Sequence, residues 1–194
     1  MAPLPAHGAA AGRLTFFINA WITEMGMESN FQSWLDSGFK ALDNDNETRI
    51  PDAAFGATNP PAGTPKSRPS FTIEIGDTQS LPDLGYDAQW WLDPTKGGAS
   101  VCITCKLDRT PRLVIDVWER QTTERGDEET KRSQHIIIAK SGKAPVTVRG
   151  GPLRISFRLV FGVSPTDPQK DLKIEDDRLK TAALTIWQEM GLSL

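Results

Sequence analysis

A single acidic residue stands in the middle of the clearest β-strand pattern of this sequence, Phe71-Thr72-Ile73-Glu74-Ile75-Gly76. Side chains alternate between the two faces of a strand, so Ile73 and Ile75 share one face and Glu74 lies on the other. A half-buried carboxylate on a central strand is unfavourable unless it is paired or holds a cation. The pattern therefore predicts a buried sheet strand in which Glu74 has a specific partner.

The rest of the chain predicts one α/β domain. Apolar residues recur at helical spacing over residues 13–25, 81–92 and 175–190, and Phe31 with Trp34 and Leu35 predicts a short helical turn. Strands are expected over residues 37–42, 50–55, 71–76, 101–107, 113–119, 134–139, 145–148 and 153–161. Helices and strands that alternate in one chain of 194 residues predict a single domain, with a mixed central β-sheet flanked by helices.

The N-terminal segment and one charged stretch differ in composition from the rest of the chain. Residues 1–12 are rich in Ala, Pro and Gly, so we expect a flexible N-terminus followed by a domain over residues 13–194. The stretch from Glu119 to Gln134 mixes both signs of charge and predicts a solvated loop or a long hairpin tip.

The sequence also restricts where the protein is expected to occur and which partners it is expected to bind. No segment approaches the ~20 consecutive apolar residues of a membrane span, and the N-terminus lacks the pattern of a signal peptide. We therefore expect a soluble protein inside the cell, in the cytoplasm or nucleus, without a membrane partner. The formal net charge of −3 excludes a generally basic nucleic-acid binder, so DNA or RNA would need a local basic strip.

The two cysteines form a C-x-x-C pattern, Cys102-Ile103-Thr104-Cys105, inside a predicted strand. Positions three apart on a strand point to opposite faces, so a shared metal or redox pair is disfavoured. The prediction is two buried, inert thiols. Phosphate-binding loops, dinucleotide fingerprints and the nucleophile elbow of hydrolases are also missing from the sequence.

A second acidic residue is available close to the strand that carries Glu74. Asp52 follows Pro51 on the preceding predicted strand. Two carboxylates from adjacent strands can bind Mg²⁺, which takes one or two carboxylates and keeps several waters, and the metal would activate water at a phosphate. In a simpler interpretation, Asp52 opens a turn and Glu74 forms an ion pair on an edge strand.

These motifs resemble a family of fungal proteins of restriction-endonuclease-like type, the PD-(D/E)xK nuclease superfamily, and more distantly a large bacterial family with the same fold. The likeness spans residues 7–119, and more loosely reaches the last predicted helix. It rests on short motifs in a fixed order: Pro51-Asp52, a proline loop, Pro69 to Gly76, and Asp87 to Leu92. The resemblance implies a restriction-endonuclease-like fold in which Asp52 and Glu74 bind Mg²⁺ or Mn²⁺.

The lysine of the family motif is missing. Gly76 occupies its position, and the segment from Pro69 to Thr95 contains neither Lys nor Arg. Lys106, on the following predicted strand, is the candidate replacement. Without a cation, both water activation and charge stabilisation in the transition state weaken.

Two main hypotheses follow from the sequence. The first is a metal-dependent phosphodiesterase acting on DNA or RNA. The alternative is a catalytically inactive nuclease-fold module that binds nucleic acid or protein and can self-associate as a homo-oligomer. Among the other polar residues, we interpret His7, Glu24, Gln79 and His135 as structural or solvent-exposed.

Overall fold

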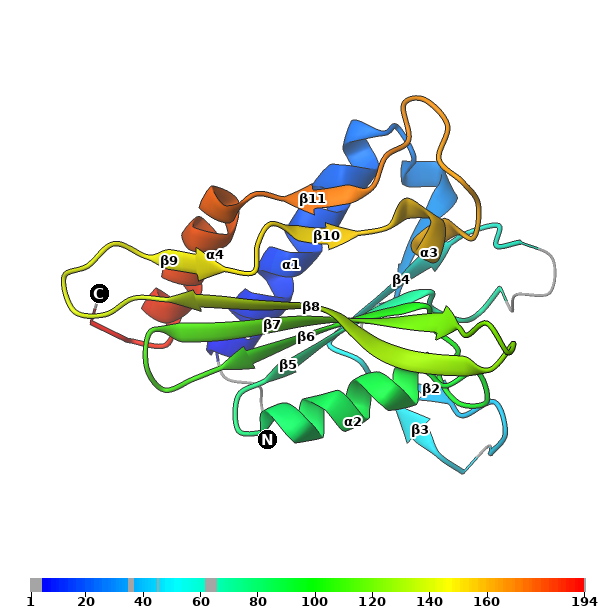
Figure 1. Ribbon diagram of the computed structural model, residues 1–194, viewed down its shortest axis with the longest axis horizontal. Helices are drawn as coiled ribbons and strands as arrows, with labels where there is room; N and C mark the ends of the chain where they lie inside the picture. Colours follow the sequence, from blue (N-terminus) through cyan, green and yellow to red (C-terminus); the bar gives the residue numbers. More distant parts are fainter. Residues whose placement is uncertain (1–4, 35–36, 45, 62–65, 194) are drawn as a thin grey trace.

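The computed structural model describes residues 5–34, 37–44, 46–61 and 66–193, and Figure 1 shows how their elements are arranged. In chain order these elements are α1 (Pro5–Glu24), the 3-10 turn η1 (Glu28–Asn30), β1 (Phe31–Trp34), β2 (Phe39–Lys40), β3 (Thr48–Arg49), β4 (Ala53–Ala57), β5 (Phe71–Gly76), α2 (Leu81–Leu92), β6 (Val101–Leu107), β7 (Arg112–Thr122), β8 (Glu128–Ala139), β9 (Thr147–Arg149), β10 (Leu153–Ile155), α3 (Phe157–Phe161), β11 (Leu172–Ile174) and α4 (Asp176–Glu189).

The central sheet has seven strands in the order β1-β4-β5-β6-β7-β8-β9. Strands β5 and β6 are parallel, because helix α2 connects them as a crossover, and the other neighbouring pairs are antiparallel. The short pairs β10-β11 and β2-β3 form separate ladders. The prediction of a single α/β domain with a mixed sheet flanked by helices is confirmed.

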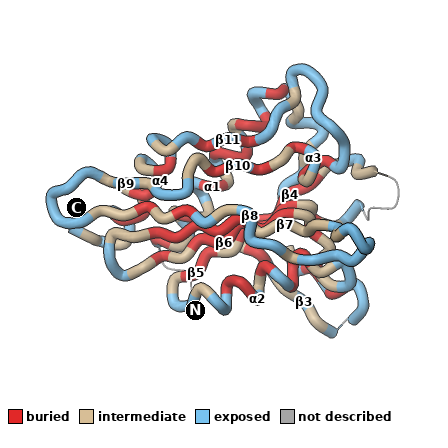
Figure 2. Tube along the Cα trace, in the orientation of Figure 1, coloured by how far each residue is buried: buried red, intermediate tan, exposed pale blue. Residues whose placement is uncertain are grey.

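Helices cover the two faces of the sheet unequally. Helices α1 and α4 lie on one face and enclose the main apolar core, whereas α2 lies on the opposite face over β5 and β6 (Figure 1). The buried parts of the chain follow the middle of the sheet and the inner sides of these helices (Figure 2). Within the described ranges, no helix is both long and apolar enough to cross a bilayer.

Local signals in the sequence account for the position of α2. The hydroxyl of Ser80 accepts a hydrogen bond from the amide of Asp83, and the Asp83 carboxylate accepts one from the amide of Ser80. This reciprocal cap fixes the first turn of the helix. The buried residues Leu84 and Trp91 then face the sheet. The cap therefore determines which side chains of α2 lie above Glu74.

The N-terminal prediction is wrong for most of its length. Helix α1 begins at Pro5, so residues 5–12, which we expected to be flexible, are helical, and residues 1–4 lie outside the described ranges. Ala6 and Ala10 are buried in the main core. Alanine favours the helix and lets its backbone approach the sheet closely, which explains why an Ala-rich segment is ordered here.

Two other predictions fail because tertiary contacts override local spacing. The predicted helical turn at Phe31 and Trp34 is strand β1, paired with β4, and Phe31 stacks on Phe55 with 5.5 Å between ring centroids. Leu35, the third residue of that prediction, lies outside the described ranges. The predicted strand over residues 153–161 ends at Ile155 and continues as helix α3.

Candidate functional site

The structure brings Asp52 and Glu74 onto neighbouring chain segments. Ala53 pairs with Ile73 in the antiparallel ladder of β4 and β5, and the Asp52 amide donates to the Ile73 carbonyl oxygen at 3.1 Å. Asp52 lies immediately before β4, because that strand begins at Ala53 and not at Ile50 as predicted. The ladder therefore places the two acidic residues next to each other across the sheet.

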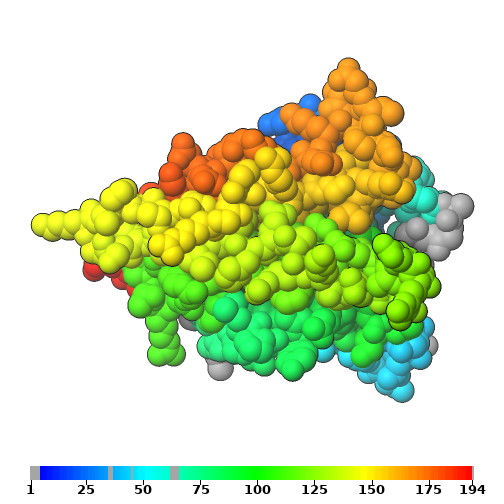
Figure 3. All heavy atoms as spheres, viewed as in Figure 1, coloured from blue at the N-terminus to red at the C-terminus, as the bar shows by residue number. Residues whose placement is uncertain are grey.

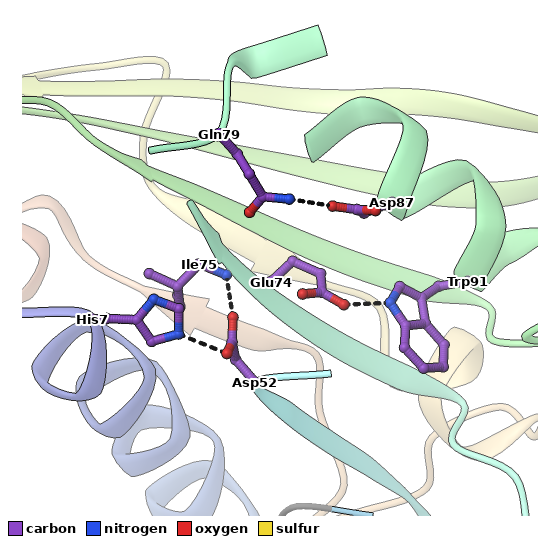
Figure 4. Close-up of polar contacts among 7 residues, drawn as sticks. All are labelled: His7, Asp52, Glu74, Ile75, Gln79, Asp87 and Trp91. Carbon is purple, nitrogen blue, oxygen red and sulfur yellow. Dashed lines mark hydrogen bonds and ion pairs between the residues drawn. The ribbon is translucent and has the colours of Figure 1, made fainter. Parts of the chain in front are cut away.

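Asp52 is held by two donors (Figure 4). Its Oδ1 lies 2.6 Å from Nε2 of His7 on helix α1, and its Oδ2 accepts a hydrogen bond from the Ile75 amide at 2.6 Å. The hydrogen bond to Asp52 raises the pKa of His7, and burial opposes this shift only in part. The sequence suggested no catalytic role for His7, and in the structure it ties the start of α1 to the acidic pair.

Glu74 points away from Asp52 and toward helix α2 (Figure 4). Trp91 Nε1 donates a hydrogen bond to Glu74 Oε1 at 2.5 Å. Burial is the main reason that the pKa of Glu74 rises from 4.5 to about 8; the negative charges of Asp52 and Asp87 add to the rise, whereas the Trp91 hydrogen bond opposes it. At neutral pH, Glu74 is therefore mostly a neutral carboxylic acid.

Asp87 is the third carboxyl group of this region. It lies on α2 and accepts hydrogen bonds from Arg49 Nη1 at 2.5 Å and from Gln79 Nε2 at 2.8 Å. Arg49 also lies over the ring of Trp90, with its Cζ 5.1 Å from the ring centroid. Arg49 is therefore engaged by Asp87 and Trp90. No sequence pattern marked it as part of this region.

The space over Gly76, where the resemblance predicts a lysine, is filled by helix α2. A Cβ atom at Gly76 would lie 2.7 Å from Leu84 Cδ1, so no larger side chain fits there unless Leu84 moves. Lys106 is the direct neighbour of Gly76 in the β5-β6 ladder. Its Nζ donates to the carbonyl oxygens of Asp77, at 2.5 Å, and of Leu107, at 2.8 Å. Lys106 thus reaches the end of β5, and within the described ranges it forms no ion pair with Asp52 or Glu74.

A row of polar residues continues from Glu74 across the sheet. Thr104 on β6 pairs with Glu74, Asp116 on β7 pairs with Thr104, and His135 on β8 pairs with Asp116. Asp116 is buried, and its Oδ1 lies 2.5 Å from Nδ1 of His135. No local sequence pattern marks this row, because each member lies on a different strand.

The remaining sequence candidates do not join the site. Glu24 forms an exposed ion pair with Lys170. Cys102 and Cys105 are buried free thiols in different apolar clusters, one on each face of the sheet. Burial raises the pKa of the Cys105 thiol to about 12 and that of Cys102 well above its ordinary value. The prediction of buried thiols is confirmed.

The donor set fits a hard divalent cation in type but not in arrangement. Carboxylate oxygens suit Mg²⁺ and Mn²⁺. Both oxygens of Asp52 are engaged, however, and Glu74 is turned toward Trp91. Across the described residues, no group of three His, Cys, Asp or Glu side chains is arranged to hold a metal ion. A cation would require Glu74 to lose its proton and rotate toward Asp52.

Neither protein-family models nor curated proteins provide a match to this chain.

Proposed function

We propose that this chain is a nuclease-like protein of PD-(D/E)xK type that has kept the acidic pair Asp52 and Glu74 and binds nucleic acid without cutting it. The observation that carries this proposal is Leu84, whose side chain fills the space over Gly76 where the family motif has its lysine. The mixed sheet and the neighbouring positions of the two acids support the resemblance.

The electrostatics of the acidic pair favour binding over cleavage. Hydrolysis of a phosphodiester builds up negative charge that a nuclease stabilises with preorganised cations. Here Arg49 is paired with Asp87, and Lys106 is bound to backbone carbonyl oxygens. Glu74 is protonated at neutral pH and cannot accept a proton from water until it ionises.

A metal-dependent phosphodiesterase is the second candidate, and the negative charges close to Glu74 favour it. Part of that rise comes from the negative charges of Asp52 and Asp87. Mg²⁺ or Mn²⁺ would relieve this repulsion and replace the proton of Glu74, with Asp52 and Glu74 as ligands. Metal affinity should therefore increase with pH up to about 8, where Glu74 ionises.

One experiment separates the two candidates. Calorimetry with Mn²⁺ and Mg²⁺ on the wild type, Asp52→Ala and Glu74→Gln measures metal binding, and labelled DNA and RNA measure binding and cleavage. Nucleic-acid binding without cleavage, with or without Mn²⁺, supports the first proposal. Cleavage that needs Mn²⁺ and disappears in Asp52→Ala replaces it with the second. A chain that binds neither metal nor nucleic acid contradicts both.

The double variant Gly76→Lys with Leu84→Ala tests the reason for inactivity. It restores a lysine at the family position and removes the side chain that closes the space. If the missing cation limits the chemistry, this variant should gain Mn²⁺-dependent cleavage, and the control Leu84→Ala should not. A folded double variant that binds Mn²⁺ yet stays inactive would show that another group is missing.

We also propose that the protein acts inside the cell, in the cytoplasm or the nucleus. Two buried thiols on opposite faces of the sheet support this, because disulfides are characteristic of secreted proteins. Self-association remains an alternative to nucleic-acid binding, and the oligomeric state in solution tests it.

A further inference from the structure

Positive charge is concentrated in one stretch of this acidic chain. From Thr130 to Thr166 the sequence contains no Asp or Glu. The stretch carries only cationic groups: Lys131, Arg132, Lys140, Lys143, Arg149, Arg154 and Arg158. Within the described ranges, Arg132 alone among these cations forms an ion pair, with Asp116. The surplus charge is therefore available to an external anion.

Part of this stretch forms a pocket at one end of the sheet. The connection between β8 and β9 projects from the molecule, in yellow in Figure 3. A pocket of about 400 Å³ lies beside it and is lined by Arg112, Ile137, Ala139, Lys140, Ser141, Ala144, Pro145, Thr147 and Arg149. Its lining includes three cationic side chains and no carboxylate.

The β-ladder explains why these cations meet. Arg112 on β7 pairs with Ala139, and Ala139 pairs with Thr147 on β9. Ile137 on β8 pairs with Arg149. Small or apolar residues of the middle strand thus form the floor, and cations stand on the two outer strands.

The side chains of the pocket differ in how far they are engaged. Arg112 Nη1 is bonded to Asp108 at 2.5 Å, and Lys140 Nζ donates to the Gly142 carbonyl oxygen at 2.6 Å. Arg149 is exposed and takes part in no ion pair within the described part of the chain. An arginine fork that is free to turn into a pocket is suited to an oxyanion that accepts two hydrogen bonds.

We propose that this pocket binds a phosphate group, with Arg149 and Lys140 as its main ligands and Arg112 at its rim. By strand alternation, Arg112 lies on the sheet face that also carries Asp116 and Glu74, on the side of α2. Because α2 covers the part of this face over β5 and β6, a nucleic-acid backbone would lie beside α2, over β7 to β9, and place one of its phosphates here. That the phosphate group belongs to a nucleic acid rests on the proposed function. The prediction of a phosphate-binding pocket does not depend on it.

The test compares two variants that remove the same charge. The double variant Lys140→Gln with Arg149→Gln removes both main ligands of the pocket. The control Lys143→Gln with Arg158→Gln removes two cations of the same stretch that do not line the pocket. All four side chains are at least partly exposed, so both variants should keep the melting temperature of the wild type.

Binding is measured in EDTA, so that a metal at Asp52 and Glu74 cannot contribute. We expect the pocket variant to weaken binding of a labelled oligonucleotide by roughly tenfold or more. The dependence of log K on log salt should fall by about one per removed contact. The control should change affinity far less. Equal losses in both variants would overturn the pocket, and so would a wild type that binds neither the oligonucleotide nor inorganic phosphate nor a mononucleotide.

Inorganic phosphate and a mononucleotide distinguish the source of the phosphate group. If calorimetry shows that either binds the wild type and not the pocket variant, the pocket takes a free phosphate. If only the oligonucleotide binds, the phosphate belongs to a polymer backbone. If the wild type binds inorganic phosphate but no oligonucleotide, the pocket proposal stands and the proposed function is contradicted. The two proposals can therefore fail separately.

Discussion

The two faces of the central sheet are built from different kinds of side chain. Toward α1 and α4, the strands present an unbroken apolar surface that includes the fully buried Phe71, Ile73 and Val101. Toward α2, the same strands present Glu74, Thr104 and other polar residues. The first face is explained by burial alone, since removing apolar area from water stabilises the fold.

The second face needs a further explanation. A carboxyl group under a helix is unfavourable unless its partners offset the loss of water. Glu74 meets this need by staying protonated and accepting from Trp91, and Asp116 meets it through His135 and Arg132. The α1 face therefore contributes stability through the larger apolar core, whereas the α2 face combines a smaller apolar cluster with polar groups that reduce its contribution. The following predictions test this division, from the largest effect to the smallest.

Phe71→Ala should be the most destabilising of these changes. Phe71 is fully buried on the α1 face and lies against Phe55, with 5.7 Å between ring centroids. Deleting a buried phenyl ring leaves a cavity and lowers the free energy of unfolding by about 3–5 kcal/mol. Urea unfolding measures this loss, and Phe71→Leu, which retains most of the volume, should lose clearly less. A small effect would contradict the role of this face.

Glu74→Gln should stabilise the protein at alkaline pH. The pKa of Glu74 rises from an ordinary 4.5 to about 8 in the folded chain, so the folded state binds more protons than the unfolded state between these values. The free energy of unfolding of the wild type should therefore fall as pH rises through this window.

The glutamine variant should lack that part of the pH dependence. At pH ~9 its free energy of unfolding should exceed that of the wild type by a few kcal/mol. Unfolding curves from pH 5 to 9 supply the measurement. Parallel slopes for the two proteins would show that Glu74 is not buried as a neutral acid.

His7→Ala should lower stability in a pH-dependent way and by a smaller amount. The pKa of His7 is raised by Asp52, so the contribution of this pair is fully present below the ordinary value of 6.5 and is lost as pH rises through the raised pKa. We expect a loss of about 1–2 kcal/mol at pH ~6 and less at pH ~9. An equal loss at both pH values would indicate packing alone.

His135→Ala should have the smallest effect on stability, below about 1 kcal/mol. The side chain is 39% exposed, and Arg132 Nη1, which lies 3.7 Å from Asp116 Oδ2, would still compensate the carboxylate. Asp116→Ala, in contrast, leaves Arg132 and His135 without their buried partner and should be more damaging. Similar losses for the two variants would mean that His135 and Asp116 act only as a pair.

Sequence patterns identified the elements that depend on local signals. The bounds of β5, α2 and β6 agree with the predictions over residues 71–76, 81–92 and 101–107, because alternation and the Ser80 cap are encoded within each segment. The β1 strand was missed because Phe31 is fixed by Phe55, a contact made across the sheet.

The candidate site was predictable only in part, for the same reason. Asp52 and Glu74 stand out as carboxylates on strands, and the structure places them side by side. Their partners His7 and Trp91 come from two helices, and neither contact can be read from spacing along the chain. The filling of the lysine position by Leu84 is likewise a property of how α2 packs.

The bond between His7 and Asp52 has a practical consequence for making shortened versions of the protein. A chain trimmed to begin at Arg13, where the domain was predicted to start, would lose His7 and the buried Ala6 and Ala10. Asp52 would keep a single donor, the Ile75 amide. Expression trials with such a trimmed chain would therefore report on a damaged protein, and purification tags that require cleavage inside α1 should be avoided.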